Sequence, residues 1–93
     1  MSGFDWDQWN IQKNEIKHGV SRLEAESSFF DLSHLVFGDW AHSVLSERRF
    51  ILIGKSMEGR ILFIGFTLRH GKIRIITARP ASRKERSIYE EKI

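Results

Sequence analysis

The second half of the chain alternates between apolar runs and short polar breaks, a pattern typical of β-strands. Three runs rich in isoleucine and phenylalanine, RRFILIG, RILFIGFTL and KIRIITAR, begin at Arg48, Arg60 and Lys72. Residues 56–59 and 70–71 separate these runs and include the glycines that tight turns favour. The spacing therefore predicts a three-stranded antiparallel meander.

The N-terminal part of the chain shows helical spacing instead. A short edge strand at 4–6 is expected to precede a helix from about Gln8 to Lys17, which Gly19 ends as a C-terminal cap. One face of this helix carries Trp9, Gln12, Lys13 and Ile16. The chain is therefore expected to begin with a strand and a capped helix.

Two capping-box patterns mark the start of two further helices. The first, at 21–24, opens a helix that is expected to run to about Phe30 and to bury Leu23 and Phe30. The second, at 82–85, opens a C-terminal helix that follows the last strand. The elements together predict an α+β fold, with an antiparallel sheet of about three to four strands, two N-terminal helices and one C-terminal helix. Because the chain has no internal repeat and a single proline, residues 1–93 are expected to form one domain.

The amino-acid composition indicates the cellular compartment in which the protein is expected to work. The chain has no cysteine, which excludes disulfides and thiolate metal sites and makes the reducing cytoplasm the expected location. Its N-terminus carries Asp5 and Asp7 instead of a basic segment, and no apolar run approaches the length of a membrane span. Neither export nor a membrane partner is therefore expected.

The net charge of +3 is distributed unevenly. Residues 1–68 hold seven Lys and Arg against nine acids, which gives −2, whereas residues 69–93 hold eight against three, which gives +5. Five of those eight cations are arginines, the residue best suited to bidentate contact with phosphate. The C-terminal part is thus either a nucleic-acid-binding surface or an ordinary solvated one.

The histidines do not predict a metal site. His18, His34, His42 and His70 form no i, i+4 pair and have no carboxylate at a familiar ligand spacing. The chain also lacks a glycine-rich phosphate loop, a nucleophile elbow and a cysteine nucleophile. We therefore expect no metal and no cofactor, and we exclude ATP hydrolysis and thiol chemistry.

Cleavage of RNA needs neither a metal nor a cofactor, because the 2′-hydroxyl of RNA can attack the adjacent phosphate once a base removes its proton. The protein must supply that base, cations for the phosphorane and an acid for the departing 5′-oxygen. His, Lys, Arg, Glu and Tyr are sufficient for these tasks, and the chain contains all of them.

Four residues are candidates for this chemistry. His18 ends the first helix directly after Lys17, where its imidazole either takes part in proton transfer or caps the helix carbonyls. Arg49, on the first strand of the meander, and Arg79, at the end of the third, either face one pocket and bind a phosphate or are solvated strand-end charges.

The C-terminal helix offers candidates for binding RNA. Arg83, Arg86 and Tyr89 follow one another at three-residue spacing, so they either track an RNA backbone or belong to a solvated helix face. Arg69 joins them as a further candidate RNA-binding residue. The tryptophans at 6, 9 and 40 are interpreted as core or interface anchors without a chemical role.

Three segments taken together resemble the BrnT family of type II toxins. They are FDWD, then NEIKHGV with Ala25 after it, and then IRIITARPASRKER followed by Tyr89. The resemblance spans nearly the whole chain and implies a fold similar to RelE-type ribonucleases and a toxin that cuts RNA until a ribbon-helix-helix antitoxin binds it. The positions that match the family pattern are Lys17, His18, Arg49, Arg79, Arg83, Glu85, Arg86 and Tyr89.

Three positions depart from the family pattern. Asn10 stands where members usually have lysine, Arg22 where an aromatic residue usually follows HGVS, and Pro80 where a second arginine is common. The loss of two cations implies altered RNA preference or reduced activity, and it affects the catalytic assignment more than the fold.

Two hypotheses about function follow. In the first, the protein is a metal-independent endoribonuclease in which Arg49 and Arg79 hold the scissile phosphate and His18 or Lys17 takes part in proton transfer. In the second, it is a non-catalytic module that joins its antitoxin in a DNA-binding autorepressor complex, through exposed apolar residues such as Phe37 and Trp40. Both predict a hetero-oligomer that reaches operator DNA only through the antitoxin.

Overall fold

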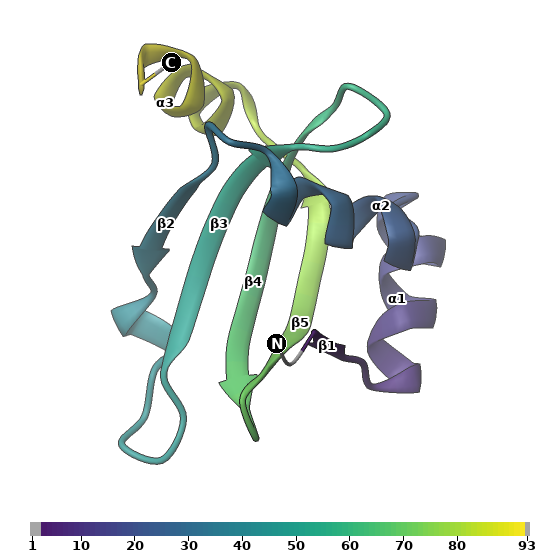
Figure 1. The fold of residues 1–93 in the computed structure, drawn as a ribbon, viewed down its shortest axis with the longest axis vertical. Coiled ribbons are helices and arrows are strands. Elements are labelled where there is room, and N and C mark those ends of the chain that lie inside the picture. The colour runs from purple at the N-terminus through teal and green to yellow at the C-terminus, as the bar shows by residue number, and fades with distance from the viewer. Residues whose placement is uncertain (1–2, 93) are drawn as a thin grey trace.

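The computed structural model describes residues 3–92, which form an α+β fold built on one five-stranded sheet (Figure 1). The strands are β1 (Phe4–Asp5), β2 (Leu35–Gly38), β3 (Arg49–Lys55), β4 (Ile61–Arg69) and β5 (Lys72–Pro80). The helices are α1 (Gln8–His18), α2 (Arg22–Ser27) and α3 (Arg83–Lys92), with two short 3-10 turns, η1 (Ser28–Phe30) and η2 (Trp40–His42). The α+β class predicted from the sequence is confirmed.

The strand order is β1-β5-β4-β3-β2, and the predicted meander β3-β4-β5 is antiparallel throughout. The prediction of an antiparallel sheet of three to four strands is wrong in two respects. Strand β1 pairs with β5 in parallel, so the sheet is mixed. Strand β2, which pairs with β3, was not predicted because its four residues are too few to show a period.

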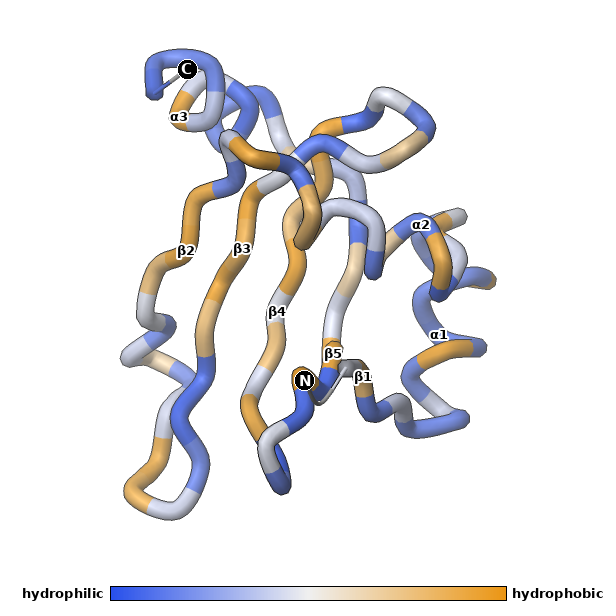
Figure 2. The backbone as a smooth tube through the Cα atoms, in the orientation of Figure 1, coloured by the Kyte–Doolittle hydropathy of each residue, from blue (hydrophilic) through white to orange (hydrophobic). Residues whose placement is uncertain are grey.

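The two faces of the sheet differ in what covers them. Strand residues Leu52, Ile64 and Phe66 are buried and pack with Ala25 of α2 and Val20 in the main core. We call this the covered face. Figure 2 shows how hydrophobic residues follow the strands while α1 and α3 are mostly hydrophilic.

The alternate strand positions form the opposite side of the sheet, which we call the open face. Its members follow from the pleat and the register, in which Phe63 lies opposite Arg79 and Gly65 opposite Thr77. Arg49 belongs to the same face through its pairing with Thr67. Charged side chains of the central strands therefore gather on the side away from the main core.

The predicted boundaries of the helices are close to those observed, but the burial predicted for Leu23 and Phe30 is wrong. On α1, Trp9 and Ile16 share a face that is exposed, at 68% and 86%, and Asn14 is the buried residue of that helix. Leu23 and Phe30 are 64% and 69% exposed, because Ala25 and Ser28 face the core in their place. The capping box had fixed where α2 begins, but it does not fix which side of so short a helix meets the sheet.

No helix within residues 3–92 is long and apolar enough to cross a membrane.

Candidate functional site

The side chain of Asn14 attaches α1 to the sheet. Strand β1 pairs only with positions 73 and 74 of β5, so the outer edge of β5 has no strand partner further along. Asn14 takes the place of that partner: its Oδ1 accepts from the Ala78 N–H at 3.1 Å, and its Nδ2 donates to the Ile76 carbonyl at 3.4 Å. This attachment brings the last turn of α1 close to the end of β5.

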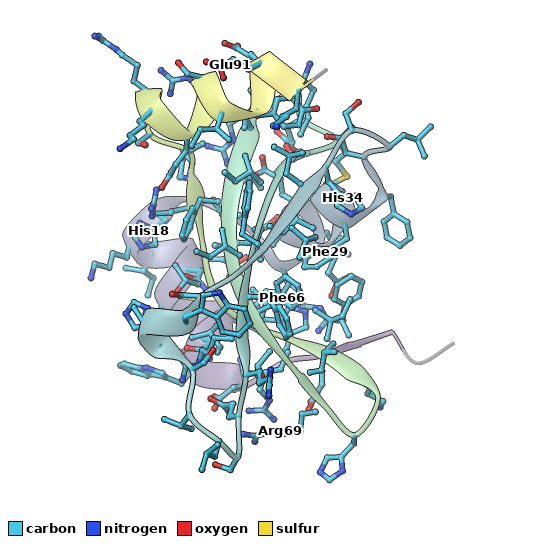
Figure 3. The ribbon with its side chains drawn as sticks, turned by 90° about the vertical axis from the view of Figure 1, so that its left-hand side faces the viewer. His18, Phe29, His34, Phe66, Arg69 and Glu91 are labelled. Atoms are coloured by element: carbon cyan, nitrogen blue, oxygen red, sulfur yellow. The ribbon has the colours of Figure 1, made fainter. Side chains whose placement is uncertain are left out.

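His18 occupies that last turn and is partly buried. Burial lowers the pKa of His18, and the neighbouring charges of Lys17, Arg79 and Lys13 lower it further. The imidazole is therefore mostly neutral near pH 7 and able to accept a proton. Figure 3 shows His18 on the side of the sheet away from Phe29 and Phe66. The structure thus brings together three of the four predicted catalytic residues: His18, Lys17 and Arg79.

Arg79 is held in a fixed orientation on the open face. Its guanidinium carbon lies 4.0 Å from the centre of the Phe63 ring. Two of its nitrogens donate to the two carboxylate oxygens of Glu85, each at 2.9 Å. Burial raises the pKa of Glu85, but hydrogen bonds from Arg79 and Ser82 outweigh it and leave that pKa below its ordinary value. The Nε–H and one terminal N–H of Arg79 stay free to donate to a phosphate.

A groove on the open face includes the ring of Phe63, over which Arg79 lies. It has a cavity of about 140 Å³ lined by Asp39, His42, Arg49, Phe50, Phe63, Gly65, Ile76 and Thr77. Phe63 connects the two parts of the site, since its ring supports Arg79 and also lines the cavity. A larger cavity of about 390 Å³ lies on the other side, but its lining is almost entirely apolar and brings no cation. The open-face groove is therefore the better candidate for a polyanion.

Arg49 lines this groove, but it lies at a different position along the sheet from Arg79. Arg49 lies opposite Thr67 and Arg79 opposite Phe63, so they are separated by four residues along β4, which is about 13 Å. The Arg49 Nε donates to Glu47 at 3.0 Å. The expectation that both arginines hold one phosphate is corrected accordingly: Arg49 lines the groove, whereas Arg79 lies next to it, over the ring of Phe63.

Two predicted RNA-binding residues lie elsewhere. Arg69 donates to Glu47 at 3.1 Å and lies six residues from Phe63 along β4, about 20 Å away, at the end of the sheet opposite α3 (Figure 3). Tyr89 is 2% exposed and donates its hydroxyl to Asp31 at 2.6 Å. Burial and this hydrogen bond raise the pKa of Tyr89 to about 12. A buried ring cannot stack on a base, so the expected contact of Tyr89 with RNA is wrong.

Arg83 and Arg86 are exposed on α3, at the same end of the sheet as Arg79. Arg86 also donates to the Ala81 carbonyl at 3.0 Å, which holds its guanidinium near the start of the helix.

Sequence reasoning missed four residues that shape the site. In the sequence Phe63 resembles an ordinary core residue and Asn14 an ordinary polar residue of a helix, and only the packed structure shows what they support. Asp39 and His42 have the i, i+3 spacing of one helical turn, which was a usable signal for a paired carboxylate and imidazole. Within residues 3–92, no three His, Asp or Glu side chains group as a set of metal ligands.

The fold defines a small α+β protein whose open face carries the side chains of Arg49 and Arg79. Residues 6–85 match the family of the ribonuclease toxin BrnT of type II toxin-antitoxin systems, so the chain belongs to the BrnT family. Among solved structures it is similar to the Brucella abortus ribonuclease toxin BrnT, with 26% identity and a TM-score of 0.67, over 89% of this chain and 100% of that chain. A search of curated protein sequences finds no match.

The family resemblance drawn from the FDWD, NEIKHGV and IRIITARPASRKER segments is thereby confirmed. Membership in a family of ribonuclease toxins implies RNA as the target and a cognate antitoxin as the partner.

Proposed function

We propose that this protein is a metal-independent endoribonuclease that cuts RNA by attack of the 2′-hydroxyl and so inhibits translation. The observation that carries the proposal is the lowered pKa of the His18 imidazole, which burial causes first and which the charges of Lys17 and Arg79 lower further, so that His18 lies within the field of the Arg79 guanidinium. A neutral base next to a cation that can hold a phosphate is what this reaction requires. A fold of the RelE type, expected from the family resemblance, stays a prediction.

In this proposal each residue has a separate task. His18 accepts the proton of the 2′-hydroxyl, and Lys17 adds positive charge next to it. Arg79 donates its free N–H groups to the phosphate oxygens as negative charge develops on them. The products are a 2′,3′-cyclic phosphate and a new 5′-hydroxyl end.

The remaining cations bind RNA on either side of the cut. Arg49 contacts a phosphate further along the groove, and Arg83 and Arg86 contact the strand beyond Arg79. Contacts of this kind depend strongly on salt, because each one releases counterions. Arg69, at the opposite end of β4, takes part only when a long RNA follows the sheet to that end.

The three positions that depart from the family pattern do not line the groove. Arg22 pairs with Glu26 of its own helix at 3.5 Å, and the Asn10 carbonyl accepts from Asn14. Pro80 is the last residue of β5, and its carbonyl accepts from Arg79 at 3.3 Å. An active enzyme is therefore compatible with all three substitutions.

The antitoxin in this proposal is a ribbon-helix-helix protein that binds operator DNA and brings the toxin to it as a hetero-oligomer. Phe37 and Trp40, which are 42% and 68% exposed, are candidate contacts for it. A second candidate function, a catalytically inactive module that acts only in this repressor complex, rests on the same exposed residues.

The test is cleavage of a defined RNA in excess chelator by the wild type and by Arg79→Ala. We expect the wild type to cut and the variant to be at least about 100-fold slower, as for loss of one transition-state donor. Lys92→Ala, which removes a cation from the last turn of α3, is the matched control and should retain full activity. If the wild type leaves RNA intact yet alters operator binding by its antitoxin, the inactive module is correct.

A further inference from the structure

Gly65 leaves a gap among the side chains of the open face. It lies in the middle of β4 and pairs with Ile51 of β3 and with Thr77 of β5. Gly65 and Thr77 both line the groove cavity of about 140 Å³. Because Gly65 has no side chain, part of the floor of this cavity is bare backbone.

The fold itself does not require glycine at position 65. Its φ lies outside the left-handed region, unlike that of Gly19 or Gly59. A Cβ atom at position 65 would lie 3.6 Å from the Thr77 Cβ, which is ordinary van der Waals contact. A β-bulge adjoins Gly65, but its extra residue is Ile76 on β5. Glycine weakens a strand interior, and where the backbone does not need it, it often marks the close approach of a ligand.

The two ends of the cavity differ in chemistry. At one end is the ring of Phe63, which the Arg79 guanidinium covers at 4.0 Å from its centre. At the other end are Asp39 and His42, whose Oδ2 and Nδ1 atoms are 2.9 Å apart. Within residues 3–92, the second oxygen of that carboxylate, Asp39 Oδ1, accepts no hydrogen bond. The cavity therefore offers an aromatic ring, a bare floor and a free hydrogen-bond acceptor.

The size and position of the cavity suit a single nucleobase. Its volume equals that of four or five water molecules, at about 30 Å³ each, which admits one planar ring system and leaves the sugar outside. Gly65 is two residues, about 7 Å, along β4 from Phe63, where Arg79 lies. A base over Gly65 therefore belongs to a nucleotide close to the phosphate at Arg79.

A phosphate is less suited to the cavity itself. The Asp39 carboxylate places negative charge in the lining, and the side chains of Phe63 and Ile76 are apolar. The guanidinium of Arg49, the cation that lines this cavity, is paired with Glu47 at 3.0 Å. These surroundings favour a flat, uncharged group with polar edges over an anion.

We propose that this cavity binds one base of the RNA, next to the phosphate at Arg79, and selects a base with an exocyclic amino group. The proposal rests on the function proposed above. The base lies over Gly65, and its amino group donates to Asp39 Oδ1, while His42 is a positioning residue that holds the carboxylate. An ionised carboxylate only accepts hydrogen bonds, so it favours adenine, guanine or cytosine over uracil, whose exocyclic groups are carbonyl oxygens.

The experiment measures binding and cleavage of a short RNA whose cut site has been mapped with the wild type. Binding is measured on RNA with a 2′-deoxy nucleotide at the cut, which lacks the attacking hydroxyl. Each nucleotide near the cut is replaced, one at a time, by an abasic nucleotide. We expect loss of one particular base to weaken binding by the wild type about tenfold, as for loss of a stacked base.

Gly65→Ala is the decisive variant, because its methyl group fits the strand but occupies the floor of the cavity. We expect it to melt at the temperature of the wild type or higher, and to bind and cut the complete RNA about tenfold less well. RNA without the critical base should bind equally to both proteins. A purely structural role of Gly65 would instead lower the melting temperature and affect both RNAs alike.

Asp39→Asn tests how the base is selected. The wild type should bind RNA with uridine at the critical position about tenfold more weakly than RNA with an amino-bearing base. An amide can also donate, so Asp39→Asn should remove most of this difference. Glu58→Gln, an exposed carboxylate in the turn between β3 and β4, is the control for the change of charge and should keep the wild-type preference.

Two results would overturn the base site: the absence of any position where loss of the base weakens binding, or a Gly65→Ala that treats complete and abasic RNA as the wild type does. Equal binding of uridine by the wild type would overturn the selection of an amino group. A wild type that cuts none of the RNAs would overturn the proposed function, and the binding measurements would still decide on the base site.

Discussion

Replacing Asn14 with leucine tests how α1 is attached to the sheet. Asn14 is 1% exposed, and its amide bonds to two backbone groups of β5, the Ala78 N–H and the Ile76 carbonyl. Leucine branches at the same carbon and has the same number of heavy atoms, but its methyl groups are bulkier and it has neither donor nor acceptor. The substitution therefore keeps the branched shape and leaves both backbone groups without their partner.

The expected cost follows from the burial of those two groups. Ala78 is 0% exposed, so its unpaired N–H costs about 1–3 kcal/mol. The Ile76 carbonyl belongs to a partly buried residue and its bond is long, at 3.4 Å, so its loss adds less. We expect the free energy of unfolding to fall by about 2–3 kcal/mol, which lowers Tm by about 10–20 °C in a chain of this length.

Urea denaturation and thermal melting measure this change, and amide hydrogen exchange at Ala78 reports it locally. Gln12→Leu is the control, because position 12 is exposed on the same helix and bonds to no strand. The folded Asn14→Leu variant should also cleave RNA more slowly, since α1 carries Lys17 and His18. A stability equal to that of Gln12→Leu would refute the view that Asn14 substitutes for a strand at this edge.

Three further predictions concern the other polar contacts. A hydrogen bond from Arg60 outweighs burial and, with one from Ser56, holds the pKa of Glu24 below its ordinary 4.5. The ionised Glu24 carboxylate therefore stabilises the fold fully above pH 4.5, and this stabilisation is lost as the pH falls through the lower pKa that Glu24 has in the folded protein. In urea titrations, Glu24→Gln should therefore lose less stability than the wild type on acidification. Tyr89→Phe removes the hydrogen bond to Asp31 and should lower the free energy of unfolding by about 1.5–3 kcal/mol, while RNA cleavage stays unchanged. A variant that is as stable as the wild type but cleaves RNA more slowly would show that the Tyr89 hydroxyl does bind RNA. Arg79→Lys keeps the charge but loses the bidentate pair with Glu85, so kcat/KM should fall at least about tenfold, and full activity would show that charge alone suffices.

The sequence was a good guide to elements that local signals define. The capping box at Ser82 and Glu85 is present as predicted: the Ser82 N–H donates to Glu85 at 2.8 Å, and the Glu85 N–H donates to Ser82 Oγ at 3.2 Å. The same Glu85 carboxylate also holds Arg79, which no local pattern shows. The meander was predictable for a similar reason, because its turns and apolar runs are adjacent in the chain.

The site was less predictable because it is assembled from distant segments. The groove joins residues from 39 to 77 in sequence, and the attachment of α1 spans 64 positions between Asn14 and Ala78. Tyr89 shows a related difficulty: one aromatic residue in an otherwise charged helix fits both a solvent-facing and a core-facing position. Its contact with Asp31, 58 positions away, decided between them.

The most direct test of the account is cleavage, in excess chelator, of an RNA with a single 2′-deoxy substitution at the mapped site. The account predicts that unmodified RNA is cut there and carries a 2′,3′-cyclic phosphate, and that removal of this one hydroxyl abolishes the cut. Cleavage that persists at the deoxy position, or that appears only when a divalent metal is added, would contradict it.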